Sequence, residues 1–325
     1  MHPLPTLEQA WREALYGTRA GGGFYRREWP ADHFTTSVQV GPELAEKVVA
    51  LAVRCGLDTV VDIGAGGGEL LAAVHAADPG LRLVGVELRA RPAGLPAPIT
   101  WQRRLPRRLT GLVVAHELLD TVPCPVVEVD GTGRPRVVHV DPVTGQEQLG
   151  DAVCGADRAW LDCWWPLSRQ GERAEIGRSR DETWAAVVAR IAHGLGVAID
   201  YGHQHGSRPA AGSLRGYARG RRVVPTYDGA VDVTADVALD AVAERVGGTV
   251  QRQRDLLGAA DPAPALAPAS RLAALTEQAR LGQLRAAGAL GELGWVLSPV
   301  GLPAAVLAEG LAEGVAAGAA APSSA

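Results

Sequence analysis

Two acidic residues and a run of glycines form the pattern with the clearest chemistry in this sequence. Asp62 lies at the end of the apolar run 59–63, and glycines follow at positions 64, 66, 67 and 68. Glu87 comes 25 residues after Asp62, the spacing of one strand–helix–strand unit. Glycines permit a tight turn and let a ligand approach bare backbone, while carboxylates accept hydrogen bonds. The pattern indicates a binding site for a nucleoside-like ligand.

The glycine spacing distinguishes between two kinds of ligand. A dinucleotide fingerprint, G-x-G-x-x-G, would require glycine at position 69, where the chain has Glu69. S-adenosylmethionine has no phosphate, and it carries an ammonium, a carboxylate and a ribose with free hydroxyls. Asp62 can bind the ammonium, Glu87 can accept hydrogen bonds from the ribose hydroxyls, and N–H groups of the glycine run can face the methionine portion. The sequence therefore predicts S-adenosyl-L-methionine as the cofactor and disfavours an NAD-dependent dehydrogenase.

The segments around this pattern predict a parallel sheet. Short apolar runs expected as strands cover residues 59–63, 82–87, 99–102, 111–115 and 196–199, with a further strand near residue 250. Segments with apolar residues at helical spacing alternate with them, at 42–53, 69–77, 181–192, 237–246 and 272–287. Such alternation places helices on both faces of the sheet. We expect an α/β fold, a Rossmann-like class I methyltransferase sheet with inserted and N-terminal cap elements.

Breaks in this alternation divide the chain. A hairpin is expected from the runs 126–129 and 136–140, and the Pro-rich stretch 261–264 indicates a linker. The expected division, in order, is an N-terminal cap segment 1–41, the first half of the cofactor-binding core 42–125, an insertion with a hairpin and a Trp-rich helical part 126–180, the second half of the core with a lid loop 181–258, a C-terminal helical part 259–317 and a disordered tail 318–325.

Several separate motifs occur in an order that is typical of one protein family. Residues 32–37 (DHFTTS) are similar to its G-D-F-x-T-S segment, and residues 62–70 (DIGAGGGEL) to its E-L-G-P-G-x-G-x-L motif. Residues 115–123 (AHELLDTVP) look like its A-N-E-F-x-D-A-L-P stretch, with His116 in place of asparagine. Further similar stretches are 199–203 (IDYGH), 212–217 (GSLRGY) and 231–234 (VDVT). The chain resembles the MidA-like methyltransferases, whose mitochondrial members are complex I assembly factors that dimethylate an arginine of a complex I subunit.

The motifs and this resemblance together imply the substrate class and the site residues. The acceptor would be a protein side chain, with arginine as the candidate suggested by the resemblance. The residues expected to contact the cofactor are Thr36, Ser37, Asp62, Gly64, Gly66, Gly68, Glu87, His116 and Glu117. The residues expected to be catalytic are His116, Glu117, Asp120, Asp200 and His203.

The positions of these acidic and histidine residues suit methyl transfer. Transfer from a sulfonium is an in-line displacement, in which the enzyme mainly positions and desolvates the reactants. The acceptor should lie beyond the carboxyl end of the fourth strand, where His116, Glu117 and Asp120 fall. Carboxylates of Glu117, Asp120 and Asp200 could orient a guanidinium and accept its protons, and His116 or His203 could relay a proton. Structural roles are open as well, as a helix N-cap for Asp120 and in loop packing for His203.

Other functions are open at this point. An enzyme that methylates a small molecule would need a closed apolar pocket, which the tryptophans between 160 and 184 could line. A cofactor-binding assembly or scaffold protein with little turnover is suggested by His116, because imidazole cannot copy every hydrogen bond of asparagine. The arginines 215, 219, 221 and 222 are either a solvated surface or a site for an acidic partner or the donor's carboxylate.

The composition argues against several classes of protein. The net charge of −4 gives no general attraction to nucleic acid or to an anionic membrane. The cysteines at 55, 124, 154 and 163 lack metal-type spacing, so no structural metal is expected and the thiols are expected to be reduced. Neither a signal peptide nor a membrane-spanning segment is expected. We expect a cytoplasmic protein whose partner is the methyl acceptor, a protein or a small molecule, while the oligomeric state is not predicted.

Overall fold

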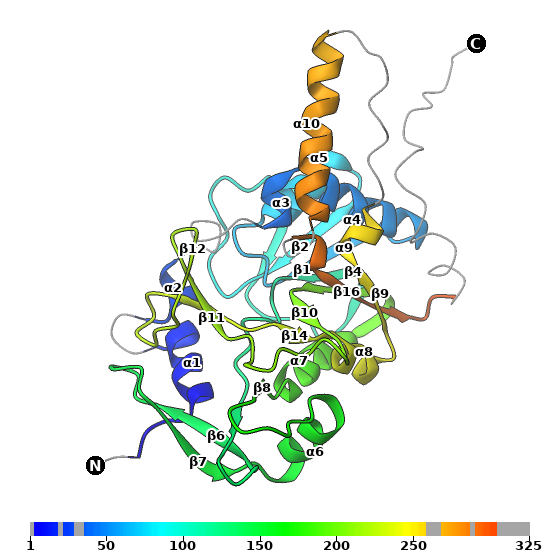
Figure 1. Cartoon of the computed structure of the whole chain (residues 1–325). Helices are drawn as coiled ribbons and strands as arrows, with labels where there is room; N and C mark the ends of the chain where they lie inside the picture. The colour runs from blue at the N-terminus through cyan, green and yellow to red at the C-terminus, as the bar shows by residue number, and fades with distance from the viewer. Residues whose placement is uncertain (1–2, 19–21, 29–35, 258–267, 287–289, 304–325) are drawn as a thin grey trace, which may run out of the picture.

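A central sheet of seven strands positions the glycine loop, in a computed structural model that describes residues 3–18, 22–28, 36–257, 268–286 and 290–303. Its strands are β1 (Thr59–Ile63), β2 (Arg82–Val86), β3 (Thr100–Gln102), β4 (Leu109–His116), β9 (Ile191–Asp200), β15 (Thr249–Arg252) and β16 (Gly294–Val300). Their order across the sheet is β15-β16-β9-β4-β1-β2-β3. Figure 1 labels β1, β2, β4, β9 and β16 of this sheet.

Most strands of this sheet run in the same direction. β1 pairs in parallel with β2 and β4, β2 pairs with β3, and β4 pairs with β9. β16 is antiparallel to both of its neighbours, so β15 again runs in the direction of β9. The predicted α/β fold with a mostly parallel sheet is confirmed. The carboxyl ends of β1, β2, β4 and β9 meet at one edge, where sites of open α/β sheets form.

Helices cover both faces of the sheet. α4 (Glu43–Arg54) and α5 (Glu69–Ala77) lie on one face, and α7 (Arg178–Val188) and α8 (Leu239–Val246) on the other. Successive residues of β4 belong to two different apolar clusters, because side chains of a strand alternate between faces. Leu112 and Val114 pack toward α4 and α5, whereas Val113 and Ala115 pack toward α7 and α8. Burial on both faces explains the apolar run 112–115 of β4.

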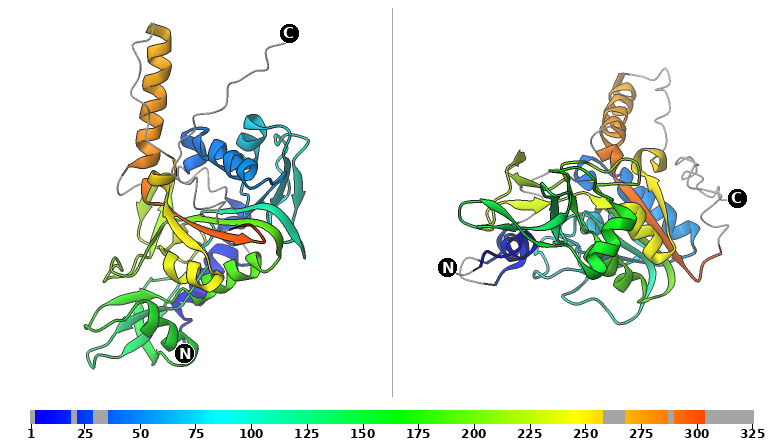
Figure 2. Two further views of the ribbon diagram at one scale, coloured as in Figure 1. Left: turned by 90° about the vertical axis from the view of Figure 1, so that its right-hand side faces the viewer. Right: turned by 60° about the horizontal axis from the view of Figure 1, so that its bottom comes forward.

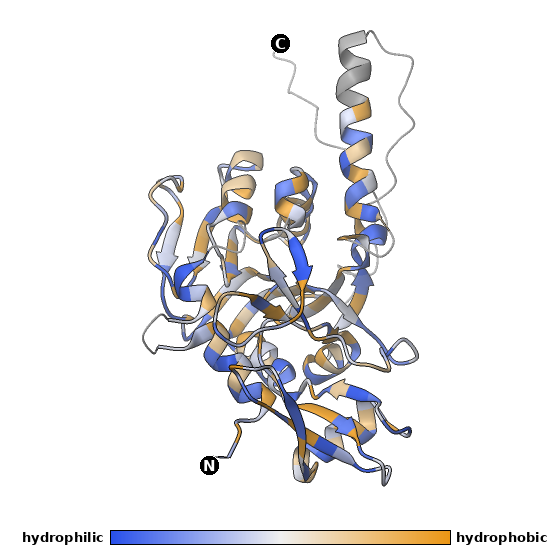
Figure 3. Ribbon diagram, turned by 60° about the vertical axis from the view of Figure 1, so that its left-hand side comes forward, coloured by the Kyte–Doolittle hydropathy of each residue, from blue (hydrophilic) through white to orange (hydrophobic). Residues whose placement is uncertain are grey.

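The insertion forms a smaller sheet of four strands. These strands are β5 (Val126–Val129), β6 (Pro135–Val140), β7 (Glu147–Ala152) and β8 (Arg173–Glu175), and α6 (Gly155–Trp164) follows β7. β5 and β6 pair antiparallel, as predicted for the hairpin. Polar and apolar residues succeed one another along this sheet (Figure 3). Trp160 and Trp165 are buried in an apolar cluster with Val127 of β5.

The N-terminal helices are fastened to the later part of the chain. They are α1 (Leu7–Tyr16), α2 (Phe24–Arg27) and α3 (Ser37–Val40). Short strands in that later part are β10 (Gly202–His203), β11 (Arg215–Ala218), β12 (Arg221–Val223), β13 (Asp232–Thr234) and β14 (Val237–Ala238). α1 packs against β13 and β6, and the buried indole of Trp11 donates to the carbonyl oxygen of Val233 at 2.7 Å. These contacts hold α1 at a fixed place beside the sheet.

The C-terminal part differs from its prediction as helical over 259–317. α9 (Gln253–Leu256), α10 (Pro268–Arg285) and the short 3₁₀ turn Leu290–Glu292 precede β16, which is a buried strand of the central sheet. Pro299 argued against predicting a strand here, because proline has no N–H group to donate to a neighbouring strand. The structure tolerates it because β15 pairs only with residues 294–297 of β16, so that among the described residues no strand needs the missing N–H on the β15 side of Pro299.

α10 projects from the body at the end opposite the inserted sheet (Figures 1 and 2). Among the described residues, no helix is long and apolar enough to cross a membrane. The predicted tail 318–325 lies outside the described residues.

Candidate active site

The loop after β1 requires glycine at three positions. Gly64, Gly66 and Gly68 have φ angles of +75°, +54° and +83°, in the left-handed region that residues with a Cβ avoid. A Cβ on Gly64 would also lie 2.8 Å from Cδ1 of Leu118. Gly68 is the N-cap of α5, and a Cβ there would meet Leu95 at 2.6 Å. The glycines therefore make a tight turn between β1 and α5 that other residue types could form only with strain.

Three N–H groups of this loop do not face the cavity, contrary to the prediction that they contact the methionine portion of a cofactor. Gly64 and Ala65 both donate to the carbonyl oxygen of Val86, at 2.8 and 3.3 Å. Gly66 donates to Oε2 of Glu87 at 3.1 Å. These donors bind the neighbouring strand and its terminal acid. At Gly64 and Gly66 the loop therefore supplies space and holds Glu87 in place.

Two fixed carboxyl groups lie beside the loop at the carboxyl edge of the sheet. Asp62 pairs with Gly85 across β1 and β2, and its side chain is buried. Burial, together with the charges of Glu69 and Glu87, raises the pKa of Asp62 to about 7. The Glu87 carboxylate accepts the N–H groups of Gly66 and Arg89, both at 3.1 Å. Asp62 is a buried carboxyl group that a cation would stabilise, which suits an ammonium group. Glu87 is a hydrogen-bond acceptor held in a fixed orientation, which suits the hydroxyls of a ribose.

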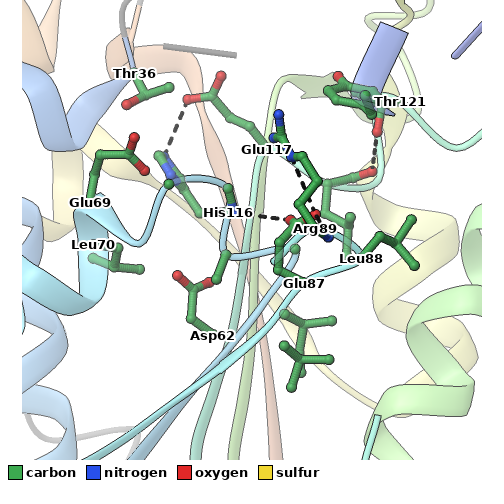
Figure 4. A pocket seen from close by; sticks show the side chains of 18 of the residues that line it. Thr36, Asp62, Glu69, Leu70, Glu87, Leu88, Arg89, His116, Glu117 and Thr121 are labelled. Carbon is green, nitrogen blue, oxygen red and sulfur yellow. Dashed lines mark hydrogen bonds and ion pairs between the residues drawn. The ribbon is translucent and has the colours of Figure 1, made fainter. Parts of the chain in front are cut away.

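A cavity of about 310 Å³ opens over this edge of the sheet (Figure 4). Its volume falls within the range of small-molecule sites, roughly 300–1,000 Å³. The predicted site residues that line it are Thr36, Asp62, Gly64, Gly66, Glu87, His116 and Glu117. The predicted site residues that do not line it are Ser37, Gly68, Asp120, Asp200 and His203. The cavity thus extends from the glycine loop to the end of β4.

Sequence analysis missed several lining residues. Leu88 and Leu105 add an apolar surface near Glu87, and Leu88 is 59% exposed. Leu88 directly follows Glu87, and a large apolar residue in that position could have predicted a wall against which a flat ligand packs. Tyr16 and Tyr25 also line the cavity. They reach it only through the packing of α1 and α2, for which no local pattern exists.

His116 and Glu117 form a buried pair at the end of β4. Nε2 of His116 lies 3.3 Å from Oε1 of Glu117, and both side chains are less than 10% exposed (Figure 4). Burial lowers the pKa of His116 to about 4 and raises that of Glu117 well above its usual value. The pair is therefore largely uncharged near neutral pH. Glu117 has a φ of +52°, a strained conformation for a residue with a side chain, and such strain concentrates at functional sites.

Asp200 and Asp120 lie behind this pair rather than in the cavity wall. Oδ2 of Asp200 accepts the N–H groups of Leu119 and Asp120, at 2.7 and 3.2 Å. Asp200 therefore fixes the turn that carries Glu117. The N-cap role considered for Asp120 is wrong, because no helix starts there: residues 117–122 form an irregular turn that leads to β5. The buried Asp120 carboxyl has a raised pKa, chiefly because of burial.

His203 and Ser37 have structural contacts. Nδ1 of His203 lies 2.6 Å from Nη1 of Arg208, and its ring packs edge-on against Trp165 at 4.5 Å. Burial and Arg208 lower the pKa of His203 to about 4. Oγ of the fully buried Ser37 accepts a hydrogen bond from Gln253 at 3.0 Å. Of the predicted motif 32–37, residues 32–35 lie outside the described residues, and Thr36 lines the cavity.

Two other expectations receive an answer. The tryptophans between 160 and 184 are absent from the cavity lining, and Trp160, Trp165 and Trp184 are buried in the core instead. Of the arginine cluster, Arg215 is largely buried, pairs with Asp236 at 2.5 Å and does not line the cavity. In the described part of the chain, no group of three His, Cys, Asp or Glu side chains could hold a metal ion.

Known proteins share both the sequence pattern and the fold of this chain. A protein-family model described as "Putative S-adenosyl-L-methionine-dependent methyltransferase" matches residues 82–255, more than half of the chain. No curated protein matches the chain.

Two solved structures from Burkholderia thailandensis have the same fold. One is a superfamily member bound to S-adenosyl-homocysteine; it is 24% identical with a TM-score of 0.76, and the match covers 94% of this chain and 91% of that chain. The other is an uncharacterized protein of the same superfamily in a native crystal; it is 24% identical with a TM-score of 0.75, and the match covers 92% of this chain and 88% of that chain.

Proposed function

This chain belongs to the family of S-adenosyl-L-methionine-dependent methyltransferases whose model it matches, and we propose that it methylates a cationic nitrogen of a protein side chain, with arginine as the first candidate. Asp62 would hold the donor's ammonium group, and Glu87 its ribose. The glycine turn leaves space for the ligand, and a Cβ at Gly64 would reduce that space. When bound, the donor supplies an electrophilic methyl group on a sulfonium.

The observation that carries the acceptor class is a cluster of four buried acids whose carboxyl groups keep raised pKa values. Its members are Glu117, Asp120, Asp200 and Asp232, each at most 7% exposed in its side chain or residue. Burial and the charges of the other acids raise the pKa of Glu117, of Asp200 and of Asp232. A group of acids held in this way gains most from a ligand that brings positive charge.

The nearby arginines offset the cluster only in part: the charges of Arg180 and Arg215 lower the pKa of Asp120, but burial still holds it above its usual value. Arg180 donates to the backbone carbonyl oxygens of Asp120, Val122 and Asp236 at 2.9–3.1 Å. Arg215 is paired with the carboxylate of Asp236, which is outside the cluster. A guanidinium has the planar geometry and the charge that this cluster lacks. The acid excess therefore favours a cationic acceptor over a neutral one.

Glu117 is the residue best placed to act on the acceptor. It lines the cavity, and among the described residues the polar atom that its Oε1 faces is Nε2 of the uncharged His116, at 3.3 Å. A cationic acceptor beside Glu117 would favour the ionised form of its carboxyl group, and this carboxylate is then a suitable base for the proton that a guanidinium nitrogen loses as it gains a methyl group. Asp200 holds the turn that carries Glu117.

The test is methyl transfer from a tritium-labelled donor to a hypomethylated protein extract, followed by acid hydrolysis and identification of the methylated amino acid. We expect labelled methylarginine. Glu117→Gln should keep donor binding and lower the transfer rate by about 10²- to 10⁴-fold, the usual contribution of a general base. Glu182→Gln, an exposed change on α7, is the matched control and should act as wild type. Label confined to the small-molecule fraction, or no transfer despite donor binding, would contradict the proposal.

A further inference from the structure

Two tyrosines from the N-terminal helices form a stacked aromatic pair in the cavity wall. Tyr16 ends α1 and Tyr25 lies in α2, and both line the cavity that also contains Glu117. Their ring centroids are 5.5 Å apart with an interplanar angle of 28°. The ring of Phe24 packs edge-on against Tyr25 at 5.3 Å. The pair therefore forms an aromatic part of the cavity wall.

Hydrogen bonds hold both rings by their hydroxyl groups. Oη of Tyr16 lies 3.1 Å from Oγ1 of Thr121 and donates to its carbonyl oxygen at 3.2 Å. Oη of Tyr25 donates to Oδ1 of Asp232 at 2.8 Å. Asp232 is fully buried, and its Oδ2 has no hydrogen-bond partner. Because the hydroxyl groups are used in this way, the faces and edges of the rings are what the pair can offer to a ligand.

The hydroxyl groups tie the pair to the turn after β4 and to β13, not to the ends of β1 and β2. Asp62, Glu87 and the glycine turn lie at the ends of β1 and β2, whereas Thr121 belongs to the turn after β4 that also carries Glu117. A ligand between this turn and the tyrosines would have an aromatic surface on one side and the Glu117 carboxyl on the other. Aromatic faces attract cations, most strongly when water is excluded. A planar guanidinium gains from such a face in addition to its charge.

We propose that Tyr16 and Tyr25 form the wall against which the cationic group of the methyl acceptor lies, and that Asp232 is a positioning residue that holds Tyr25 in that wall. This inference rests on the proposed function and adds the residues that select the acceptor. It assigns the N-terminal helices α1 and α2 a part in acceptor binding, beyond the closing of the core. The indole bond of Trp11 to Val233 keeps α1 in register with β13, the strand that carries Asp232.

The test uses the purified full-length chain saturated with S-adenosyl-homocysteine. Nα-acetyl-L-arginine methylamide is titrated into it by calorimetry, and the uncharged citrulline analogue is titrated in parallel. We expect the arginine probe to bind at least tenfold more tightly than the citrulline probe. Tyr25→Leu should weaken the arginine probe by about 5- to 30-fold, the loss expected when a desolvated cation loses an aromatic face. It should leave the citrulline probe and S-adenosyl-homocysteine within twofold.

Conservative variants separate positioning from simple damage to the fold. Tyr25→Phe keeps the ring, so its preference for arginine over citrulline should stay within threefold of wild type. Asp232→Asn still accepts the tyrosine hydroxyl and should preserve that preference, whereas Asp232→Ala should lower it. Tyr227→Phe, a change at a tyrosine that lines a separate pocket, is the control and should bind both probes as wild type does.

The outcomes distinguish this inference from the proposed function. Equal arginine affinity in wild type and Tyr25→Leu overturns the inference, as does a wild type that binds S-adenosyl-homocysteine but prefers neither probe. If Tyr25→Leu does not fold, the comparison of Asp232→Ala with Asp232→Asn decides the matter, and equal preference in those two overturns the inference. A wild type that does not bind S-adenosyl-homocysteine contradicts the proposed function itself.

Discussion

Binding of S-adenosyl-homocysteine should become tighter as the pH rises from 6 to 8, because Asp62 must be ionised to hold the ligand's ammonium. In the free protein, burial and the charges of Glu69 and Glu87 raise the pKa of Asp62 to about 7. Below that pH the carboxyl group is protonated, so binding has to displace a proton. Above it the carboxylate is already present. The affinity should therefore fall on acidification and level off at alkaline pH.

The magnitude follows from the ionised fraction of one carboxyl group. With a pKa of about 7, that fraction is about 0.1 at pH 6 and about 0.9 at pH 8, which corresponds to a change of about tenfold in affinity, or ~1.4 kcal/mol. His116 adds nothing in this window, because its pKa is about 4. The assay is calorimetric titration at pH 6, 7 and 8 in two buffers of different ionisation enthalpy, which also measures proton release.

The matched variant is Asp62→Asn, which keeps the size of the side chain and removes its titration. Its affinity should be no higher than that of wild type at pH 6, and it should not change with pH. Proton release on binding should be close to one at pH 6 in wild type and absent in the variant. A pH-independent wild type, or one that binds more tightly at pH 6, would refute the assignment of Asp62 to the ammonium.

Four further outcomes follow from the site. Glu87→Gln should weaken S-adenosyl-homocysteine by about 10- to 100-fold in calorimetry, because the ribose loses a charged acceptor. Gly64→Ala should lower the free energy of unfolding by about 1–3 kcal/mol in chemical denaturation, while Gly94→Ala, which has open space and no positive φ, should change it little. Asp200→Ala should reduce the methyl-transfer rate with donor affinity retained, since it frees the turn of Glu117; equal rates would contradict this. His116→Asn should leave the pH profile of transfer unchanged between pH 6 and 8, because the imidazole is already uncharged there.

The end of the cavity at the glycine turn could be predicted from the sequence because it is built from consecutive residues. The strand, the glycine turn and α5 follow each other along the chain, and the helix predicted over 69–77 has those bounds in the structure. Glycine at positive φ and an acid after each of two strands are local signals with a direct physical cause. The predicted helix 181–192 was less accurate, since Ile191 already pairs with Leu109 in the sheet. Sheet pairing there outweighs helical periodicity.

The end of the cavity near β4 and the tyrosines could be predicted only in part, because segments far apart in the sequence build it. Glu117 and His116 were found from the motif at the end of β4. Asp200 was placed at the correct strand end, but its carboxylate faces the backbone of residues 119 and 120 rather than the cavity. Tyr25 meets Asp232 across more than 200 residues of chain. No spacing rule connects such positions, and only the packing of α1 and α2 against β13 brings them together.

The central claim is that the glycine-loop cavity holds the methyl donor with its reactive end toward Glu117 and the tyrosine wall. A crystal structure of the chain with S-adenosyl-homocysteine tests this most directly. We predict ribose hydroxyls within hydrogen-bonding distance of Glu87, the ammonium next to Asp62, and the sulfur facing the space between Glu117 and Tyr25. A ligand bound outside this cavity, or one whose sulfur is directed away from Glu117, would contradict the account.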